Sequence, residues 1–105
     1  MIRAAFSRRR RKSDANQREI VSALRTAGYT VQVLHRVGDG FPDLLAANPL
    51  DKLNILIEVK APGKSLTPSE SKFFSEWPGL SIMAESGEQA LKQLAQLRAA
   101  YRSRR

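Results

Sequence analysis

The middle of the chain, residues 41–60, carries two apolar runs on either side of a polar centre. The centre, residues 48–52, contains Asn and Pro, which favour turn conformations, together with Asp51 and Lys52, which we expect to face solvent. The run after the centre is dominated by Ile, Val and Leu and suits a strand of about seven residues. This pattern predicts a β-hairpin.

The two faces of this hairpin differ in chemistry. A loop at residues 49–52 places Asp43 directly opposite Glu58, with Cβ atoms about 5 Å apart. Lys60 follows two residues after Glu58 and therefore projects from the same face. A bulge or another loop length would shift this register. The other face is apolar and consists of Leu44, Ala46, Ile55, Ile57 and Val59.

A helix is predicted before the hairpin, from about Ser13 or Asp14 to Ala27. Asp14 and the glutamine three residues later form a capping-box pattern, and Gly28 stops the helix. Glu19 lies at the edge of the apolar stripe, where periodicity alone favours a surface position. The stripe consists of Ile20, Val21, Ala23, Leu24 and Ala27.

The segment between this helix and the hairpin predicts a strand over residues 29–37, with Val31, Val33 and Val37 on one face. His35, near its end, is expected at the surface or the edge of the core. Residues 38–40, Gly-Asp-Gly, then lead into the hairpin, and their glycines allow either a close approach to a substrate or a tight bend. Asp39 is a weaker alternative metal ligand.

After the hairpin, residues 61–65 predict a loop and Thr67-Pro68 the start of a second helix. Thr67 and Glu70 form a capping box, which explains Glu70 without a catalytic role, and a Pro-Gly pair ends the helix. Its three aromatic side chains are expected in the core or in a subunit interface rather than stacked on bases. They are Phe73, Phe74 and Trp77.

The remaining residues predict a short strand over 80–84 and a last helix that runs to about Ala100. Ser86 and Gln89 form a capping box at the start of this helix. The element order is thus α-β-β-β-α-β-α. Short connections make the first three strands an antiparallel meander, and the middle helix allows the fourth strand to join by a crossover. The fold class is α/β, a single domain with a mixed four-stranded sheet flanked by helices.

Charge is distributed unevenly along the 105 residues. The chain has 18 basic and 10 acidic residues, and six of the basic ones lie in residues 1–12 and three in residues 101–105. Residues 13–100 are therefore nearly neutral and form the domain, between a basic arm and a basic tail. The arm is expected to be disordered in isolation and to bind phosphate by counterion release, or to act only as a solubilising tail. Its basic cluster is Arg8, Arg9, Arg10, Arg11 and Lys12.

The composition also excludes several classes of site. The chain has no cysteine, so disulfides and thiolate zinc sites are excluded, and a cytoplasmic location is expected. It has no apolar stretch of membrane-spanning length, and the basic N-terminus lacks the long apolar run of a secretory signal. No membrane partner is therefore expected.

The two facing acids, Asp43 and Glu58, indicate a chemical function. Like charges directly opposite each other on paired strands are unfavourable, so folding alone does not explain Asp43 and Glu58. Two carboxylates at this distance suit a hard divalent cation such as Mg²⁺, and a lysine beside the ion can orient water or stabilise charge on a phosphate. In the alternative interpretation, Asp43 caps a turn, and Glu58 and Lys60 lie on a solvated edge.

These residues resemble a known family. Residues 38–45, Gly-Asp-Gly-Phe-Pro-Asp-Leu-Leu, followed by Ile57-Glu58-Val59-Lys60, resemble the PD-(D/E)xK nuclease superfamily and are most similar to the small VRR-NUC-type nucleases. In those, Gly-x-Gly-x-Pro-Asp-Leu precedes Glu-Val-Lys. The resemblance continues into residues 66–68, covers about residues 14–97 and implies a restriction-endonuclease-like fold.

The resemblance also implies roles for individual residues. Asp43 and Glu58 would bind Mg²⁺, which Mn²⁺ can replace, and the backbone carbonyl of Val59 would join them. Lys60 would position the attacking water or neutralise charge on the phosphate. Glu19 would complete the metal site as a third carboxylate, which the pattern alone does not favour. Relatives carry Gln at the position of Glu70, so no contact is carried over to it.

The function expected from these features is Mg²⁺-dependent hydrolysis of phosphodiester bonds, in DNA, including structured or branched DNA. Arg36 and Lys64 are expected to contact phosphates, and two active sites for two strands favour a homodimer. One alternative is a non-catalytic basic protein that binds or packages nucleic acid, which explains the tails but not the facing acids. Another is an RNase toxin on the same scaffold, because no side chain can be tied to a 2′-hydroxyl.

Overall fold

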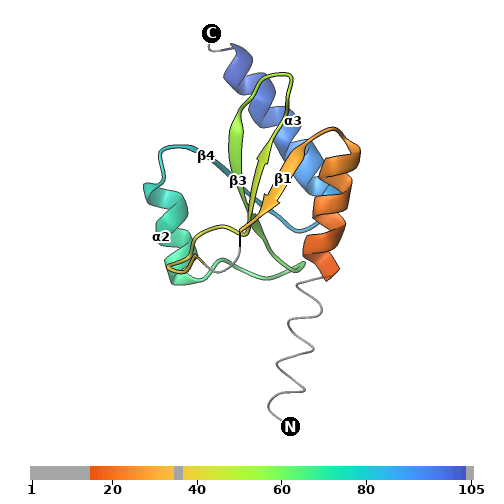
Figure 1. Cartoon of the computed structure of the whole chain (residues 1–105). Coiled ribbons are helices and arrows are strands. Elements are labelled where there is room, and N and C mark those ends of the chain that lie inside the picture. The colour runs from red at the N-terminus through yellow and green to blue at the C-terminus, as the bar shows by residue number, and fades with distance from the viewer. Residues whose placement is uncertain (1–14, 35–36, 104–105) are drawn as a thin grey trace.

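The computed structural model of the protein describes residues 15–34 and 37–103 and contains a four-stranded mixed sheet in the order β1-β2-β3-β4 (Figure 1). The first three strands form an antiparallel meander, and β4 pairs with β3 in parallel. The strands are β1 (Thr30–Val33), β2 (Leu44–Ala47), β3 (Asn54–Val59) and β4 (Leu80–Ala84). The predicted fold class and strand directions are confirmed.

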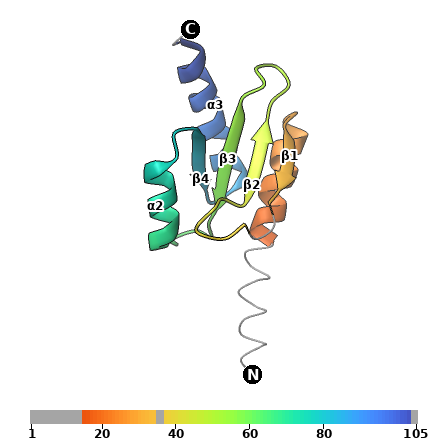
Figure 2. The same ribbon diagram turned by 60° about the vertical axis from the view of Figure 1, so that its left-hand side comes forward.

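Three helices accompany the sheet: a first helix over residues 15–26, α2 (Pro68–Glu76) and α3 (Gly87–Ser103). The first helix and α3 cover one face of the sheet, whereas α2 lies apart from both, beside β4 (Figure 2). The crossover between the parallel strands β3 and β4 contains α2, and the ion pair between Lys60 and Glu70 places the first turn of this helix close to the end of β3. The part of the chain in these ranges contains no helix that is long and apolar enough to cross a membrane.

The core lies between the sheet and the two helices that cover it. The first helix contributes Ile20 and Leu24, and α3 contributes Ala90 and Leu94, all with no exposed surface. The sheet contributes the apolar face of the hairpin, as predicted: Leu44, Ala46, Ile55 and Ile57 are all buried. Burial of this face fixes the strand register, because a slip of one residue would turn its side chains to the other side.

The register of the hairpin is also as predicted, since Leu44 pairs with Ile57 and Ala46 with Ile55. In the turn, the side chain of Asn48 accepts a hydrogen bond from the Leu50 N–H at 2.9 Å. Such a local side-chain acceptor stabilises a tight turn. The turn therefore sets the alignment of all residues that follow on both strands.

The expectation that Asp51 faces solvent was wrong. Its carboxylate pairs with the Arg98 guanidinium of α3, and Arg98 also donates to the Tyr29 hydroxyl at 3.2 Å. The guanidinium lies 5.7 Å from the centre of the Tyr29 ring, within cation–π range. The tip of the hairpin is thus attached to the last helix.

The helix ends follow the predicted signals. Gly28 has φ +97°, and the N–H groups of Gly28 and Tyr29 donate to carbonyls of the last helical turn, which is a Schellman motif. At α2, the Thr67 side chain accepts the Glu70 N–H, and the Glu70 side chain accepts the Thr67 N–H, so the capping box is complete. The Asp14 cap lies outside the described residues.

At α3 the predicted box is modified. The Gln89 N–H donates to the Ser86 hydroxyl at 3.1 Å, but the Gln89 side chain accepts the N–H of Glu85 instead of that of Ser86. α3 also extends to Ser103, beyond the predicted end near Ala100. No Gly or Pro follows Ala100 to stop the helix, so part of the predicted tail is helical.

The predicted first strand was too long, because β1 ends at Val33. The chain must reverse direction before β2, and Gly38, Asp39 and Gly40 all adopt positive φ, at 93°, 53° and 75°. Val37, which was expected on the apolar face, is 60% exposed. His35 and Arg36 lie outside the described residues, as do the basic arm and residues 104–105.

Candidate active site

Asp43 is held at the entrance to β2 by contacts with the neighbouring strand β3. Its N–H donates to the Ile57 carbonyl at 3.1 Å, and its Oδ2 accepts the Val59 N–H at 2.8 Å. Pro42, directly before it, is fully buried and restricts the backbone on that side. The carboxylate is thereby directed across the end of the hairpin toward the side chain of Glu58.

Glu58 lies on the same face of β3, and only 3% of the residue is exposed. Burial, followed by the negative charges of Asp43 and Glu70, raises the pKa of Glu58 to about 9. Its Oε1 atom is buried and has no hydrogen-bond partner. A buried carboxylate oxygen without a partner is costly, so this position calls for a proton or a cation.

Burial also raises the pKa of Asp43, and the hydrogen bond from the Val59 N–H offsets only part of this effect. Asp43 and Glu58 interact directly through their side chains. Two carboxyl groups this close do not both ionise readily without a positive charge between them.

Lys60 supplies the amine of the motif. Its Nζ lies 3.9 Å from Glu58 Oε2 and 2.5 Å from Glu70 Oε1. The Lys60 N–H donates to the Ala84 carbonyl at 3.0 Å, which fixes the residue to the end of β4. The structure therefore brings Asp43, Glu58 and Lys60 together on one face, as predicted.

Residues 11–85 match the family model of the VRR-NUC domain. The chain belongs to the VRR-NUC family. This is a family of PD-(D/E)xK-type nucleases, so membership implies nuclease activity. A solved structure described as "VRR_NUC domain" is 22% identical, with a TM-score of 0.63, over 80% of this chain and 95% of that chain. It has the same fold. Comparison with curated proteins gave no match.

Glu70 belongs to this VRR-NUC site, although the sequence indicated only a cap. Burial would raise the pKa of Glu70, but the Lys60 ammonium and the Thr67 N–H outweigh it and lower the pKa. The residue thus joins the first turn of α2 to Lys60. The capping pattern concealed this role, because it already explained why an acid stands at that position.

Asn16 is a second residue that the sequence analysis did not identify. Its side-chain amide donates to the Lys60 carbonyl at 2.9 Å and so connects the first helix with the motif lysine. The available signal was its position: Asn16 precedes Ile20 by four residues and Leu24 by eight, so a polar side chain lies on the apolar stripe.

The structure does not bring every predicted residue to the site. Glu19 is exposed, and its carboxylate lies beside Gly87 at the start of α3. Within residues 15–34 and 37–103, no cluster of three or more acidic, histidine or cysteine side chains is arranged to hold a metal ion. The third-carboxylate role of Glu19 therefore stays a prediction. Asp39 borders a shallow hollow with Lys72 of α2 instead.

The glycine-rich segment before the site has a structural explanation. A Cβ on Gly40 would lie 2.4 Å from the backbone carbon and oxygen of Ser69, at the start of α2. Of the two interpretations offered by the sequence, the structure supports the tight bend. Gly40 lets the segment pack on α2 and thereby places Asp43 between β3 and the cap that holds Glu70.

The side chains present fit a divalent metal ion. The donors are carboxylate oxygens of Asp43 and Glu58, which hard cations such as Mg²⁺ and Mn²⁺ prefer. The Oε1 atom of Glu58 is buried without a hydrogen-bond partner, and burial is the main cause that raises the pKa of both acids. VRR-NUC domains, as PD-(D/E)xK-type nucleases, usually use such metals.

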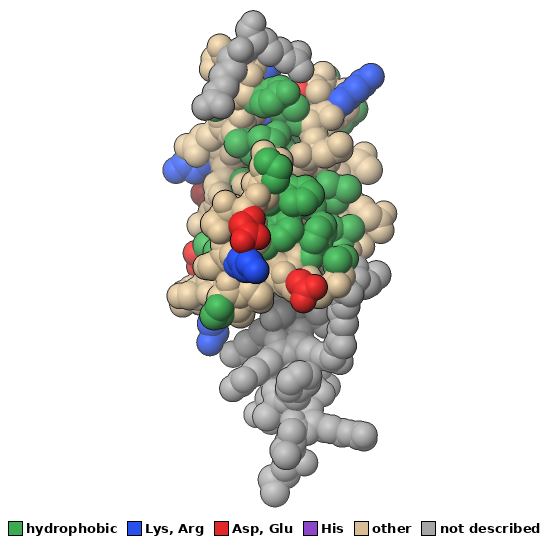
Figure 3. Space-filling model, turned by 90° about the vertical axis from the view of Figure 1, so that its left-hand side faces the viewer, with side chains coloured by type: hydrophobic (Ala, Val, Ile, Leu, Met, Phe, Trp, Pro, Cys, Tyr) green, Lys and Arg blue, Asp and Glu red, His purple; other side chains and the backbone are tan. Residues whose placement is uncertain are grey.

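The aromatic side chains of α2 are not core residues, so that part of the prediction was wrong: α2 has no buried residue. Phe73 lies 5.1 Å from Phe41 and 5.2 Å from Trp77, measured between ring centres, and Trp77 is 42% exposed. Figure 3 shows hydrophobic side chains gathered on this side of the molecule, with acidic and basic ones beside them. An exposed apolar area of this kind is typical of an interaction surface.

Proposed function

We propose that the protein is a Mg²⁺-dependent nuclease that hydrolyses phosphodiester bonds in DNA, with Mn²⁺ able to replace Mg²⁺. One observation carries the proposal: Glu58 is buried with an unpartnered oxygen atom directly beside the carboxyl group of Asp43. A fold without a ligand at this point gains nothing from two adjacent buried acids, whereas a cation-binding site requires them.

In this proposal each residue has a distinct role. Asp43 and Glu58 hold the cation, and the Val59 carbonyl, at the end of the same strand, is the third donor that we assign. The cation supplies positive charge that stabilises the developing negative charge on the phosphate. Lys60 donates hydrogen bonds to a phosphate oxygen or holds the attacking water in line with phosphorus.

In the absence of substrate, Glu70 forms an ion pair with the Lys60 ammonium. Its carboxylate pairs with Nζ at 2.5 Å, so the amine is charged and directed into the site. A substrate phosphate competes for the same ammonium and exchanges with Glu70. The capping bond from the Thr67 N–H holds Glu70 in place during this exchange.

The decisive experiment compares purified wild-type protein with Asp43→Asn and Lys60→Ala. Each variant should lose Mg²⁺-dependent cleavage by at least about a hundredfold, because each removes a group that acts in the transition state, while DNA binding stays largely intact. A panel of single-stranded, duplex, flap and four-way DNA, together with RNA, identifies the substrate. Equal residual cleavage by both variants would reveal a contaminating nuclease and contradict the assignment, and cleavage of RNA alone would favour an RNase.

We also propose that the nuclease acts as a homodimer, which would provide two active sites for two strands. The exposed aromatic surface of α2, with Trp77 and Phe73, supports this proposal. Light scattering at micromolar concentration should give the mass of two chains, and the mass of one chain would contradict the dimer.

A further inference from the structure

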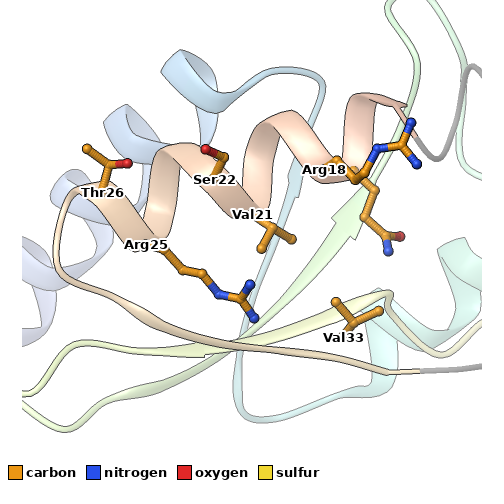
Figure 4. Close-up of a pocket in the computed structure, with 7 residues that line it drawn as sticks. Arg18, Val21, Ser22, Arg25, Thr26 and Val33 are labelled. Carbon is orange, nitrogen blue, oxygen red and sulfur yellow. The ribbon is translucent and has the colours of Figure 1, made fainter.

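A groove of about 470 Å³ lies between the first helix and β1, outside the site formed by Asp43, Glu58 and Lys60 (Figure 4). Val21 lines the groove from the helix, and Val33 lines it from β1. Arg18 lies at one end and Arg25 at the other. Nothing in the proposed hydrolysis uses this groove.

The charge of the groove favours an anionic ligand. Among the described residues that line it, none is acidic and the two charged ones are arginines. Arg25 donates one hydrogen bond to the Val31 carbonyl at 2.9 Å, which orients its guanidinium across β1. A guanidinium has five N–H donors, so most of them remain available for a ligand. Arg18 is exposed.

The spacing of the arginines suits a repeating anion. Arg18 and Arg25 are separated by two helical turns, about 10 Å along the helix axis. In duplex DNA each strand presents a phosphate about every 3.4 Å along the duplex axis, so two arginines aligned with that axis would span about three phosphates. Ser22 and Thr26 are also among the residues that line the groove.

The first helix connects the groove with the active site. The helix that forms one side of it begins at the site, where the Asn16 amide donates to the Lys60 carbonyl. Arg18 follows Asn16 by two residues and Arg25 by nine, so the groove extends away from the site along the same helix.

We infer that this groove binds the phosphate backbone of the substrate strand beside the bond that is cut, with Arg18 and Arg25 as its phosphate contacts. The inference rests on the proposed nuclease function and names the path of the strand. It predicts a backbone contact that is independent of base sequence, because contacts to phosphate carry no sequence information.

The test measures binding of a fluorescent 20-nucleotide DNA strand to the full chain in chelator, over a range of salt concentrations. Arg18→Gln should weaken binding roughly fivefold to tenfold near 0.1 M salt and should reduce the salt slope by about one, as expected for one lost phosphate contact. Lys92→Gln is the matched control: Lys92 is exposed on α3, does not line the groove, and its loss changes the net charge equally.

Arg25→Gln should weaken binding by a similar factor. This variant also removes the hydrogen bond to Val31, so its thermal unfolding must be compared with that of the wild type before the binding loss is assigned to phosphate. The same losses with an RNA strand would show that the backbone is recognised rather than the sugar. Equal effects of Arg18→Gln and Lys92→Gln, or no effect of either, would overturn the inference.

A small chromogenic phosphodiester, bis(p-nitrophenyl) phosphate, separates this inference from the proposed function. It is too short to occupy the groove, so Arg18→Gln should hydrolyse it at the wild-type rate while losing kcat/KM on the long strand. If the wild-type protein hydrolyses neither substrate, the proposed function fails, and the binding measurements in chelator still decide the groove.

Discussion

At the scale of single residues, the Glu58 carboxyl couples the stability of the fold to pH. Its pKa is raised to about 9 from an ordinary value of 4.5, chiefly by burial, so the folded state binds a proton that the unfolded state releases. The stabilisation from this proton is complete below pH 4.5 and is lost as pH rises toward 9. We expect metal-free protein to lose roughly 2–5 kcal/mol of unfolding free energy over this range.

Urea unfolding in chelator at several pH values measures this loss. Glu58→Gln keeps the shape of the side chain but cannot ionise, so its stability should depend on pH much less than that of the wild type, with the raised pKa of Asp43 as the remaining contribution. Added Mg²⁺ should stabilise the wild-type protein more at pH 8 than at pH 6, because the cation replaces the proton. An equal pH dependence in both proteins would show that Glu58 is not the responsible group.

Glu70 allows a second prediction at this scale. Glu70→Gln preserves the capping box, since Gln serves equally at that position, but removes the negative charge beside Lys60 and Glu58. The pKa of Glu58 should fall, so the acidic limb of the pH profile of kcat/KM should move to lower pH with little change in thermal stability. An unchanged profile would mean that Glu70 has no electrostatic influence on the site.

The shared face of Asp43, Glu58 and Lys60 was predictable from the sequence because strand alternation is a strict local rule. The spacing of Glu58 and Lys60 places them on one face of any strand, and the turn length then fixes Asp43. Asn16 was not identified and Glu70 was assigned only to the helix cap, because their contacts with Lys60 depend on where the first helix and α2 pack against the sheet. Such packing is not encoded in local spacing.

At the scale of elements, two matched glycine substitutions can test the packing of the glycine-rich segment on α2. Gly40 and Gly63 have similar positive φ values, 75° and 81°, so alanine causes comparable backbone strain at both. A Cβ at Gly40 also collides with the Ser69 backbone, whereas a Cβ at Gly63 meets nothing within 4 Å.

Gly63→Ala should therefore cost about 1 kcal/mol, and Gly40→Ala at least about twice as much. Gly40→Ala should also reduce cleavage, because the segment that positions Asp43 must move away from α2. Thermal unfolding and cleavage of the best panel substrate measure both effects. Equal costs for the two variants would show that the packing of this segment contributes nothing.

The elements also show where sequence patterns reach their limit. Residues 80–84 form the predicted strand with no change of boundary, since a helix cap follows directly. Strand β1 is shorter than predicted, because the alternation of valines continues into a segment that must turn toward β2. Periodicity identifies which residues share a face, but the path of the chain decides how many of them remain in the sheet.

At the scale of the whole molecule, the uneven charge distribution predicts that the basic arm contributes to DNA binding, whereas the domain carries the site of cleavage. Removing residues 1–12 deletes six of the 18 basic residues and should weaken DNA binding and flatten its salt dependence. Cleavage of bis(p-nitrophenyl) phosphate should stay unchanged, because the site lies in the domain. An unchanged salt slope would show that the arm does not contact phosphate.

The attachment of the hairpin tip to α3 has a practical consequence for anyone who isolates this module. The family match ends at residue 85, before α3 begins, yet α3 supplies Ala90 and Leu94 to the interior and Arg98 to the tip of the hairpin. A fragment trimmed to the matched boundary would expose the underside of the sheet to water and release the turn that aligns the acids. The smallest fragment that we expect to keep the fold therefore includes α3.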